Sequence, residues 1–371
     1  MGEPYIGLTY SPADVVPEGG IIVFRSSNIQ NGEIDYSDIV RVEKRIKDSI
    51  RTRKDDLLIC ARNGSPRLIG KNALLCEKDA NQTFGAFMLV FRSEDNHFIH
   101  HLLSTKSYYS QVSENLGARI NQITTANIKD FEFSVPQGRV ERNIIARFLD
   151  LIDQRISIQN KVIEKYESLI KALTDKIVDD LLKGSIVLFN QMYIQAGEGG
   201  TPSTSVEQYY LNGTIPFIKI DDLSSKYLVK NKDFINELGL SKSSAWLIPS
   251  NSVIYSNGAT IGAISINTYP VSTKQGILGV VPAAGVNAEY LYYLMSSRYF
   301  NEQVQRIITE GTMKTAYLKD MNKIPCPLPS PNEQQRIVAG LSALSSKLES
   351  ELAALLSYES IKRYLLRNLF I

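Results

Sequence analysis

The chain has 371 residues, which predicts about two or three domains at roughly 150 residues each. Its hydrophobic fraction of 43% and charged fraction of 22% exclude a mainly disordered chain. The net charge of +2, from 41 Lys and Arg against 39 Asp and Glu, excludes nucleic-acid binding by bulk charge alone. Any such binding site has to be a local basic patch.

In chain order, the sequence predicts a mixed head, a long helix, a second mixed head and a second long helix. The heads contain short apolar, β-branched runs that are typical of buried strands. These runs are 20–24, 57–60, 87–91 and 252–255. The expected boundaries are 1–137 for the first head, 138–183 for the first helix, 184–331 for the second head and 332–371 for the second helix.

The first predicted helix carries a stripe of residues at alternating spacings of four and three, a 3.5-residue period that is typical of a coiled-coil seam. The seam positions are Ile145, Leu149, Ile152, Ile156, Gln159, Ile163, Tyr166, Ile170, Leu173, Ile177 and Asp180. Gly184 stands where a C-terminal glycine commonly ends a helix. Gln159 either fixes the register against a partner helix or marks a solvent-facing turn, and the sequence favours neither.

The second predicted helix has a similar seam with a one-residue slip midway. Its members are Ile337, Leu341, Leu344, Leu348, Leu352 and Leu355. Its simplest partner is the first helix, because two such helices separated by a head can pair antiparallel. We therefore expect an α+β protein in which two heads are joined by two long antiparallel coiled-coil helices, with an internal pseudo-two-fold repeat.

The two halves of the chain echo each other at an offset of about 191 to 195 residues. Residues 56–59 match residues 251–254, and the tripeptide Tyr-Glu-Ser occurs at both 166–168 and 358–360. Each match alone is weak. Their common order and nearly constant offset predict an internal duplication.

Cysteine usage and the N-terminal residues favour a soluble, cytoplasmic protein. The three cysteines have no C-x-x-C spacing, which argues against a disulfide framework or a zinc site. The longest apolar run, 85–91, is far shorter than the ~20 residues that a membrane span needs. The residues after Met1 do not form a signal peptide.

The usual catalytic motifs are missing from the sequence. It has no phosphate-binding G-x-x-x-x-G-K-[ST] loop, no G-x-S-x-G elbow, no H-E-x-x-H zinc motif and no N-P-P-[YF] loop of an amino-methyltransferase. The only histidines are His97, His100 and His101, and their counterparts in the second half are Ala288, Leu291 and Tyr292. A metal site needs a further ligand within reach, so we expect these histidines to lie on a helix without a metal. The sequence predicts a chain without catalysis of its own.

Residues 41–71 hold ten Lys or Arg against four acidic residues, an excess that can neutralise several phosphates. A Gly- and Pro-containing loop, 61–67, follows a predicted strand there and matches 256–260, and a second pair of basic, polar loops is 117–122 and 311–315. Arg can pair with guanine and Asn with adenine in a DNA groove. We predict DNA contacts by Arg62, Asn63, Arg67, Lys71 and Arg119 in the first head and by Asn257, Thr260, Lys274 and Lys314 in the second.

Short segments at the borders of the heads carry a family resemblance. The second head opens with Gly-Gly-Thr-Pro-Ser-Thr at 199–204 and Gly-Thr-Ile-Pro-Phe-Ile at 213–218, and ends with Ile-Pro-Cys-Pro-Leu-Pro at 324–329 and Glu-Gln-Gln-Arg-Ile at 333–337. The first head ends in a reduced version at 133–136 and 140–145. Together with the order of heads and helices, these segments resemble the specificity (S) subunit of type I restriction–modification systems, over essentially the whole chain.

The resemblance implies that each head is a target-recognition domain reading one half of a bipartite, asymmetric site in double-stranded DNA. It implies that two methyltransferase subunits, carrying S-adenosylmethionine, dock on the helices, and that restriction subunits carry ATP and Mg. This chain would hold no cofactor, perform no chemistry and contact no membrane. In one departure, the first head already begins at 5–10, where the second head has a lead-in of roughly fifteen residues. We therefore expect its usual opening strand to be missing.

Two other functions fit the same organisation. The chain could be an adaptor whose heads bind proteins, with the helices as a spacer, or a stand-alone nuclease. Strong salt-dependent DNA binding separates a DNA-reading subunit from an adaptor. Turnover by the purified chain without partners would identify the nuclease.

Overall fold

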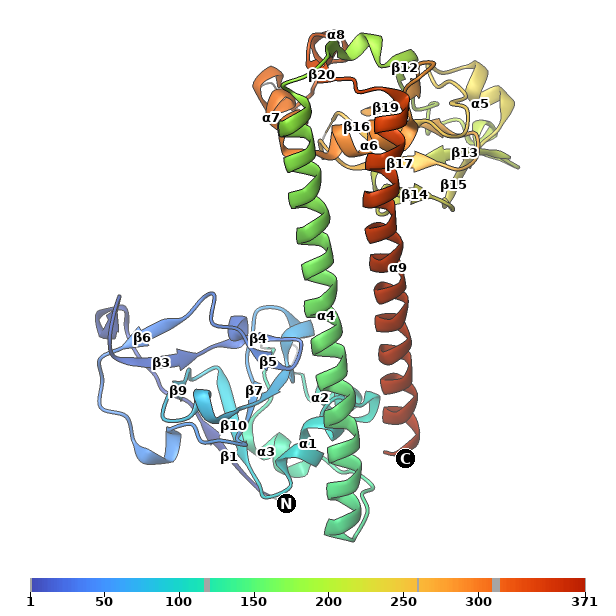
Figure 1. Cartoon of the computed structure of the whole chain (residues 1–371). Coiled ribbons are helices and arrows are strands. Elements are labelled where there is room, and N and C mark those ends of the chain that lie inside the picture. Colours follow the sequence, from blue (N-terminus) through green and yellow to red (C-terminus); the bar gives the residue numbers. More distant parts are fainter. Residues whose placement is uncertain (1, 117–120, 259, 309–313, 371) are drawn as a thin grey trace. The chain divides into compact units, whose positions relative to one another are not determined.

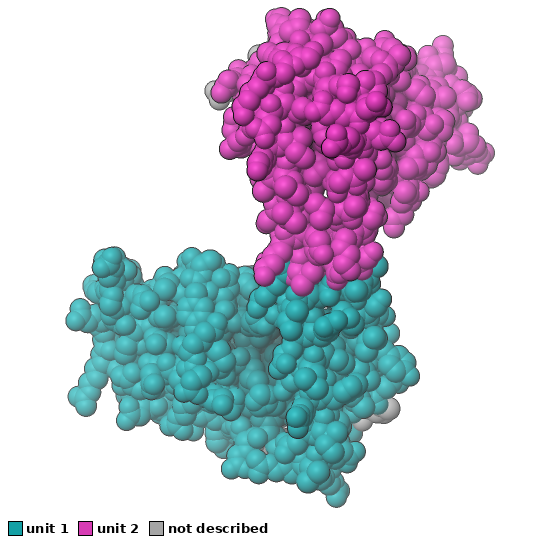
Figure 2. Space-filling model, viewed as in Figure 1, with its two compact units in different colours: residues 1–161, 353–371 teal, residues 162–352 magenta. Residues whose placement is uncertain are grey.

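The computed structural model of the chain describes residues 2–116, 121–258, 260–308 and 314–370. These residues form two compact units (Figure 2). Unit 1 contains Met1–Lys161 and Ala353–Ile371, and unit 2 contains Val162–Leu352. Each unit therefore holds one head and a stretch of each long helix. Within the described ranges, no helix is both long enough and apolar enough to cross a membrane.

The first head is built on a four-stranded antiparallel sheet with the order β1-β10-β7-β8. Its strands are β1 (Glu3–Ile6), β10 (Met88–Arg92), β7 (Leu57–Cys60) and β8 (Asn72–Leu74). All four residues of β7 and the first four of β10 are buried. The unbroken apolar runs at these positions therefore correspond to strands that are covered on both faces.

A second sheet, with the order β2-β6-β3-β9, and a β4-β5 hairpin complete the strands of the first head. They are β2 (Val15–Val16), β3 (Ile21–Phe24), β4 (Ile29–Gln30), β5 (Glu33–Ile34), β6 (Val40–Val42) and β9 (Thr83–Phe84). After β10 come the helices α1 (Asn96–Leu102), α2 (Lys106–Glu114) and α3 (Thr125–Asp130) (Figure 1). Thr105 and Thr124 cap α2 and α3 by accepting backbone N–H bonds of the first turn, which stabilises both helix starts.

The second head repeats this plan with a central sheet of order β12-β19-β16-β17-β14 and a smaller sheet of order β15-β13-β18. The strands are β12 (Tyr193–Glu198), β13 (Ile215–Ile218), β14 (Tyr227–Leu228), β15 (Asp233–Ile235), β16 (Val253–Ser256), β17 (Ile264–Asn267), β18 (Ser272–Thr273) and β19 (Ile277–Pro282). The helices are α5 (Glu237–Ser241), α6 (Ala288–Ser296), α7 (Arg298–Ile307) and α8 (Leu318–Met321). β12, β19, β16 and β17 take the places of β1, β10, β7 and β8, so the predicted duplication is confirmed.

The first head has its opening strand, so the expectation that this strand is missing was wrong. β1 pairs antiparallel with β10 as β12 pairs with β19, although β1 has four residues and β12 has six. Unit 2 has a further pair, β11 (Ile186–Leu188) with β20 (Pro325–Pro327). Among the described residues of unit 1 this pair has no counterpart, and residues 131–136 form no strand. The heads therefore share four strands of the central sheet and differ in this outer pair and in β14, which extends the sheet of the second head.

The first long helix is α4 (Arg139–Leu181), close to the predicted bounds of 138–183. Every predicted seam residue from Ile145 to Ile177 is buried or half-buried, whereas Asp180 is exposed. Gln159 is buried inside the seam, so the interpretation of a solvent-facing turn was wrong. The 3.5-residue period of the sequence thus predicts the buried face of α4 along most of its length.

The second long helix is α9 (Pro331–Asn368), and its seam differs from the prediction at one position. Leu352 is 39% exposed, and Glu351 is turned inward in its place. Since Leu348 and Leu355 are half-buried, the alternation of three and four continues through Glu351 without the predicted slip. Lys347 Nζ lies 2.7 Å from Glu351 Oε1, and this ion pair compensates part of the cost of a carboxylate at the seam.

The two long helices run antiparallel within unit 1. Lys362 Nζ pairs with Asp153 Oδ1, and Arg155 Nε donates to the Tyr358 hydroxyl at 3.2 Å. From Asp153 to Arg155 the residue numbers rise along α4, while their partners on α9 fall from 362 to 358, so the two helices run in opposite directions. The Arg155 guanidinium also lies 5.4 Å from the centroid of the Tyr358 ring, which adds a cation–π contact.

Replacement of Ile163 by aspartate should destabilise unit 2. Ile163 is buried at a seam position of α4, so the new carboxylate would lose its hydration without a partner placed to receive it. We expect the free energy of unfolding, measured by urea denaturation of the full chain, to fall by about 2–3 kcal/mol. Leu169→Asp is the matched control, since Leu169 is exposed on the same helix and its replacement should change stability by less than about 0.5 kcal/mol. Equal stability of the two variants would contradict a buried seam.

Candidate nucleic-acid interface

In the first head, the loop after the buried strand β7 is held against two other loops by backbone hydrogen bonds. The Ala61 N–H donates to the Phe87 carbonyl at 3.0 Å, and the Ala61 carbonyl accepts from the Ile123 N–H at 2.9 Å. The next residue, Arg62, also donates its N–H to Phe87, at 3.0 Å. These bonds fix residues 61–65, 85–87 and 121–123 side by side, and we call these residues the first loop platform.

The second head makes the same pair of bonds after the equivalent strand, β16. The Asn257 N–H donates to the Gly276 carbonyl at 3.0 Å, and the Asn257 carbonyl accepts from the Ala316 N–H at 2.9 Å. We call residues 257, 258, 260, 274–276 and 314–316 the second loop platform. The two platforms therefore share a backbone framework, and the side chains at its matching positions differ between the heads.

A cavity of about 1210 Å³ lies beside the first loop platform, inside unit 1. Arg62 and Phe87 lie on its wall, and the Arg62 guanidinium is 4.9 Å from the centroid of the Phe87 ring. Phe87 is 57% exposed, and among the described residues no hydrogen bond or ion pair holds the Arg62 guanidinium. A guanidinium and an open aromatic face can meet a phosphate, a base edge or a base face. The strand expected at 87–91 begins one residue later, at Met88, so Phe87 lies in the loop before β10.

Asn63 also lines this cavity, but its amide groups serve the platform itself. Its Nδ2 donates to Ser26 Oγ at 2.9 Å, and its Oδ1 accepts the Ser65 N–H at 3.0 Å. These bonds use one N–H of Nδ2 and one lone pair of Oδ1, so the predicted contact of Asn63 with adenine stays a prediction. The geometry gives Asn63 the role of shaping the loop that presents Arg62.

Two other predicted contacts of the first head, Arg67 and Lys71, do not line the cavity. Arg67 is exposed on a short 3₁₀ helix, Pro66–Leu68, and Lys71 is half-buried with its Nζ 3.4 Å from Gln30 Oε1. Arg119 lies outside the described residues. The structure therefore brings Arg62 and Asn63 together and does not place Arg67 or Lys71 with them.

In the second head the predicted contacts divide in the same way. Asn257 is 1% exposed, and its Nδ2 donates to the Ala316 carbonyl at 3.1 Å. Its backbone position corresponds to Ala61 and not to Asn63, so the side chain is enclosed and the predicted DNA contact is not supported. Thr260, Lys274 and Lys314 are exposed on the second loop platform.

Parts of the basic segment 41–71 are tied to neighbouring acids. Lys44 Nζ lies 3.1 Å from Asp14 Oδ2, and the Ser11 N–H together with Lys44 lowers the pKa of the Asp14 carboxyl. Arg51 Nε lies 3.7 Å from Asp48 Oδ1. Four further basic residues of the segment are exposed, namely Arg45, Lys47, Arg53 and Lys54. The segment therefore keeps a local positive charge beside the first head's sheet.

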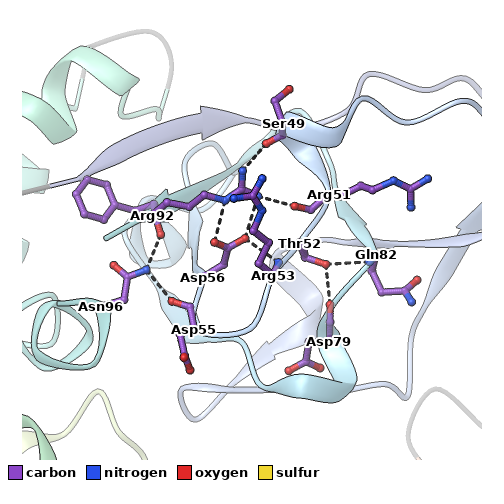
Figure 3. Close-up of polar contacts among 11 residues, drawn as sticks. Ser49, Arg51, Thr52, Arg53, Asp55, Asp56, Asp79, Gln82, Arg92 and Asn96 are labelled. Atoms are coloured by element: carbon purple, nitrogen blue, oxygen red, sulfur yellow. Dashed lines mark hydrogen bonds and ion pairs between the residues drawn. The ribbon is translucent and has the colours of Figure 1, made fainter. Parts of the chain in front are cut away.

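A buried ion pair anchors this basic segment, and no sequence motif indicated it. Arg92 Nε and Nη2 donate to the two carboxylate oxygens of Asp56 at 2.9 and 3.0 Å (Figure 3). The same guanidinium donates to the backbone carbonyls of Ser49, at 2.8 Å, and of Arg51. The pairing of β10 with β7 sets Arg92 opposite Asp56, so this contact follows from strand register.

Family comparison decides how these two platforms are interpreted. The model of the family described as "Type I restriction modification DNA specificity domain" matches residues 8–168 and again residues 194–357. The chain belongs to this family. Each specificity-domain match begins in a head and ends within a long helix, so the family's repeating unit is a head followed by a helix, as the internal echo predicted.

Curated relatives of this specificity-domain chain are specificity subunits of type I restriction enzymes. The MjaIX subunit of Methanocaldococcus jannaschii is 31% identical over 176 residues, which cover 47% of this chain and 40% of that protein. The EcoR124I/EcoR124II subunit of Escherichia coli is 29% identical over 144 residues, covering 38% of this chain and 36% of that protein. Each match spans well under half of the relative's length.

Solved structures share the fold over nearly the whole chain. The S subunit of a type I restriction–modification system from M. genitalium has a TM-score of 0.62 at 18% identity, covering 100% of this chain and 94% of that one. A chain from a study of complex assembly and conformational transition of the type I R-M system has a TM-score of 0.56 at 16% identity, covering 98% and 95%. The specificity-domain fold is therefore common to all three.

Proposed function

We propose that the chain is the DNA-specificity subunit of a type I restriction–modification complex and reads a bipartite, asymmetric site in double-stranded DNA. The observation that carries this proposal is the duplicated loop platform, built by equivalent backbone bonds in two heads that each match the specificity domain. A shared framework with different side chains suits two heads that read different half-sites.

The contacts that we propose for each half-site are basic and polar side chains of the platforms and of the segments beside them. In the first head Arg62 reads bases beside Phe87, and Arg67, Lys71 and Arg119 contact phosphates. In the second head Thr260, Lys274 and Lys314 do the reading. Phosphate contacts fix the register on the duplex, whereas base contacts supply the sequence preference.

An apolar stripe on α4 supports docking of methyltransferase subunits. Within unit 1, five large apolar residues of this helix are each 50–74% exposed, although the adjoining seam is buried or half-buried. They are Val140, Ile144, Phe148, Leu151 and Ile158. A contiguous exposed apolar surface of this kind marks a protein-binding site. We propose that two methyltransferase subunits bind the long helices and that restriction subunits join through them.

The chemistry in this proposal belongs to those partners. The methyltransferase subunits hold S-adenosylmethionine and methylate adenine, and the restriction subunits hold ATP and Mg. The specificity chain itself binds none of these three cofactors and performs no catalysis, and it acts in the cytoplasm on the DNA of its own cell. The sequence carries none of the catalytic motifs that would favour a nuclease.

Methylation-detecting sequencing tests the proposal. Genomic DNA is compared from cells that express the methyltransferase subunit with this chain and from cells that express the methyltransferase subunit alone. We expect a split, asymmetric adenine-methylation motif that is present only with the chain. Salt-dependent DNA binding by the assembled complex provides the second readout. An unchanged methylation pattern with assembled complex would contradict the proposal and favour an adaptor.

A further inference from the structure

The three histidines of the chain lie on α1 and face acidic residues of α4 within unit 1. His101 Nε2 and His97 Nδ1 each donate to one carboxylate oxygen of Asp150 at 2.8 Å. His101 is fully buried, and its Nδ1 has no hydrogen-bond partner although it lies 3.7 Å from Asp153 Oδ2. The further ligand that a metal site requires is therefore supplied by α4, about fifty residues away in the sequence.

Hydrogen bonds assign the tautomers of both inner histidines. Asn72 Nδ2 donates to the carbonyls of Gly70 and Leu103, so its Oδ1 is the atom that accepts from His100 Nδ1 at 2.9 Å. This bond leaves a lone pair on His100 Nε2. In the same way, the bond to Asp150 protonates His101 Nε2 and leaves a lone pair on the buried Nδ1.

This arrangement has the second layer of bonds that metal-binding histidines need. A metal-ligating imidazole commonly donates its other N–H to a carboxylate or carbonyl oxygen, which fixes the ring and raises its basicity. His101 has Asp150 in that position and His100 has Asn72.

The donor atoms lie close enough for one ion. One ligand atom each from His100, His101 and Asp153 fall within 4.8 Å of one another. A tetrahedral ion with ligand distances of about 2.0–2.2 Å needs donors about 3.4 Å apart. The donor atoms therefore have to approach one another by up to about 1.4 Å, which side-chain rotation can supply. Lys362 bonds the other oxygen of Asp153, which leaves Oδ2 as the ligand.

The second head fastens to its helix differently. There Ala288, Leu291 and Tyr292 replace the histidines. Lys226 forms an ion pair with Glu289 of α6, and both side chains hydrogen-bond to the Ser342 hydroxyl of α9. The chain therefore has one histidine cluster, in the first of its two repeats.

We propose that His100 Nε2, His101 Nδ1 and Asp153 Oδ2 bind one divalent transition-metal ion, with Zn²⁺ the best match to two imidazoles and one carboxylate, and a water in the fourth position. The bound ion fastens the first head to the long helix α4.

Zinc titration of the purified full chain in competition with a chromophoric chelator tests this site. We expect one Zn²⁺ per chain and a higher melting temperature that EDTA reverses. His100→Gln and Asp153→Asn should each weaken binding at least about 100-fold, and Asp150→Asn about 10- to 100-fold, because it removes a partner of His101. Lys362→Gln should tighten binding, since it removes a positive charge next to Asp153.

Cys76→Ser is the matched control, because Cys76 is an exposed thiol and the other plausible zinc ligand. Its affinity should equal that of the unaltered chain. Melting of each metal-free variant confirms that it is folded, and Asp153 is half-exposed, so its isosteric replacement is expected to fold. Loss of binding in Cys76→Ser, equal binding in His100→Gln and Asp153→Asn, or no stoichiometric zinc at all would each overturn the proposal.

Discussion

Replacement of Arg92 by methionine should reduce the free energy of unfolding of the first head by about 3–5 kcal/mol, the usual cost of removing one partner of a buried ion pair. Arg92 and Asp56 are 13% and 3% exposed, so the variant leaves the Asp56 carboxylate buried without its guanidinium. The variant also leaves the carbonyls of Ser49 and Arg51 without their guanidinium donor. It removes the cation–π contact of Arg92 with the Tyr5 ring, whose centroid lies 4.7 Å away. The basic segment should loosen together with the sheet.

Denaturant unfolding of the full chain, with hydrogen exchange at β7 and β10 to locate the effect, measures this loss. Arg53→Met is the matched control, since Arg53 is exposed in the same segment, and it should change stability by less than about 0.5 kcal/mol. The double variant Asp56→Leu with Arg92→Met should recover part of the loss, because no charge then remains buried. Equal destabilisation by Arg53→Met and Arg92→Met would contradict the assigned role of the pair.

The long helices and the duplication could be predicted because both depend on local, repeated patterns. The seam of α4 follows directly from spacing, since residues at alternating intervals of three and four lie on one face of a helix. At Leu352 the same reasoning failed. It assigned the seam position to the apolar Leu352, whereas the helix geometry places Glu351 there and leaves Leu352 exposed. Phase is a property of the whole helix and outweighs the hydrophobicity of one side chain.

The candidate interface was predictable only in part, because exposure and hydrogen bonding depend on distant segments. Asn63 and Asn257 have the right chemistry for reading a base, yet one amide is bonded to Ser26 and the other to Ala316. The register of β7 with β10 and the acids of α4 facing the histidines likewise join residues far apart in sequence. Only the fold reveals which polar groups are buried or already hydrogen-bonded.

Arg62→Ala should relax or abolish reading of one half-site while the other half-site stays unchanged. The Arg62 guanidinium is exposed on the cavity wall beside Phe87, within a head that has its own core. Loss of a bidentate contact to a base weakens discrimination by about 1–3 kcal/mol, or roughly 5- to 150-fold. Methylation-motif sequencing should therefore show a degenerate position in one half of the motif only.

Two further variants separate base reading from general attraction to DNA. Lys54→Ala removes an exposed charge of the basic segment away from the cavity wall, so it should weaken binding to all sequences alike and reduce the salt dependence by about one ion. Lys274→Ala lies on the second loop platform and should alter only the other half-site. Equal loss at both half-sites in Arg62→Ala would contradict independent heads, and an unchanged motif would exclude Arg62 as a reader. A change confined to one half in each platform variant would assign each half-site to its head, because the heads share a backbone framework and differ in the side chains that it presents.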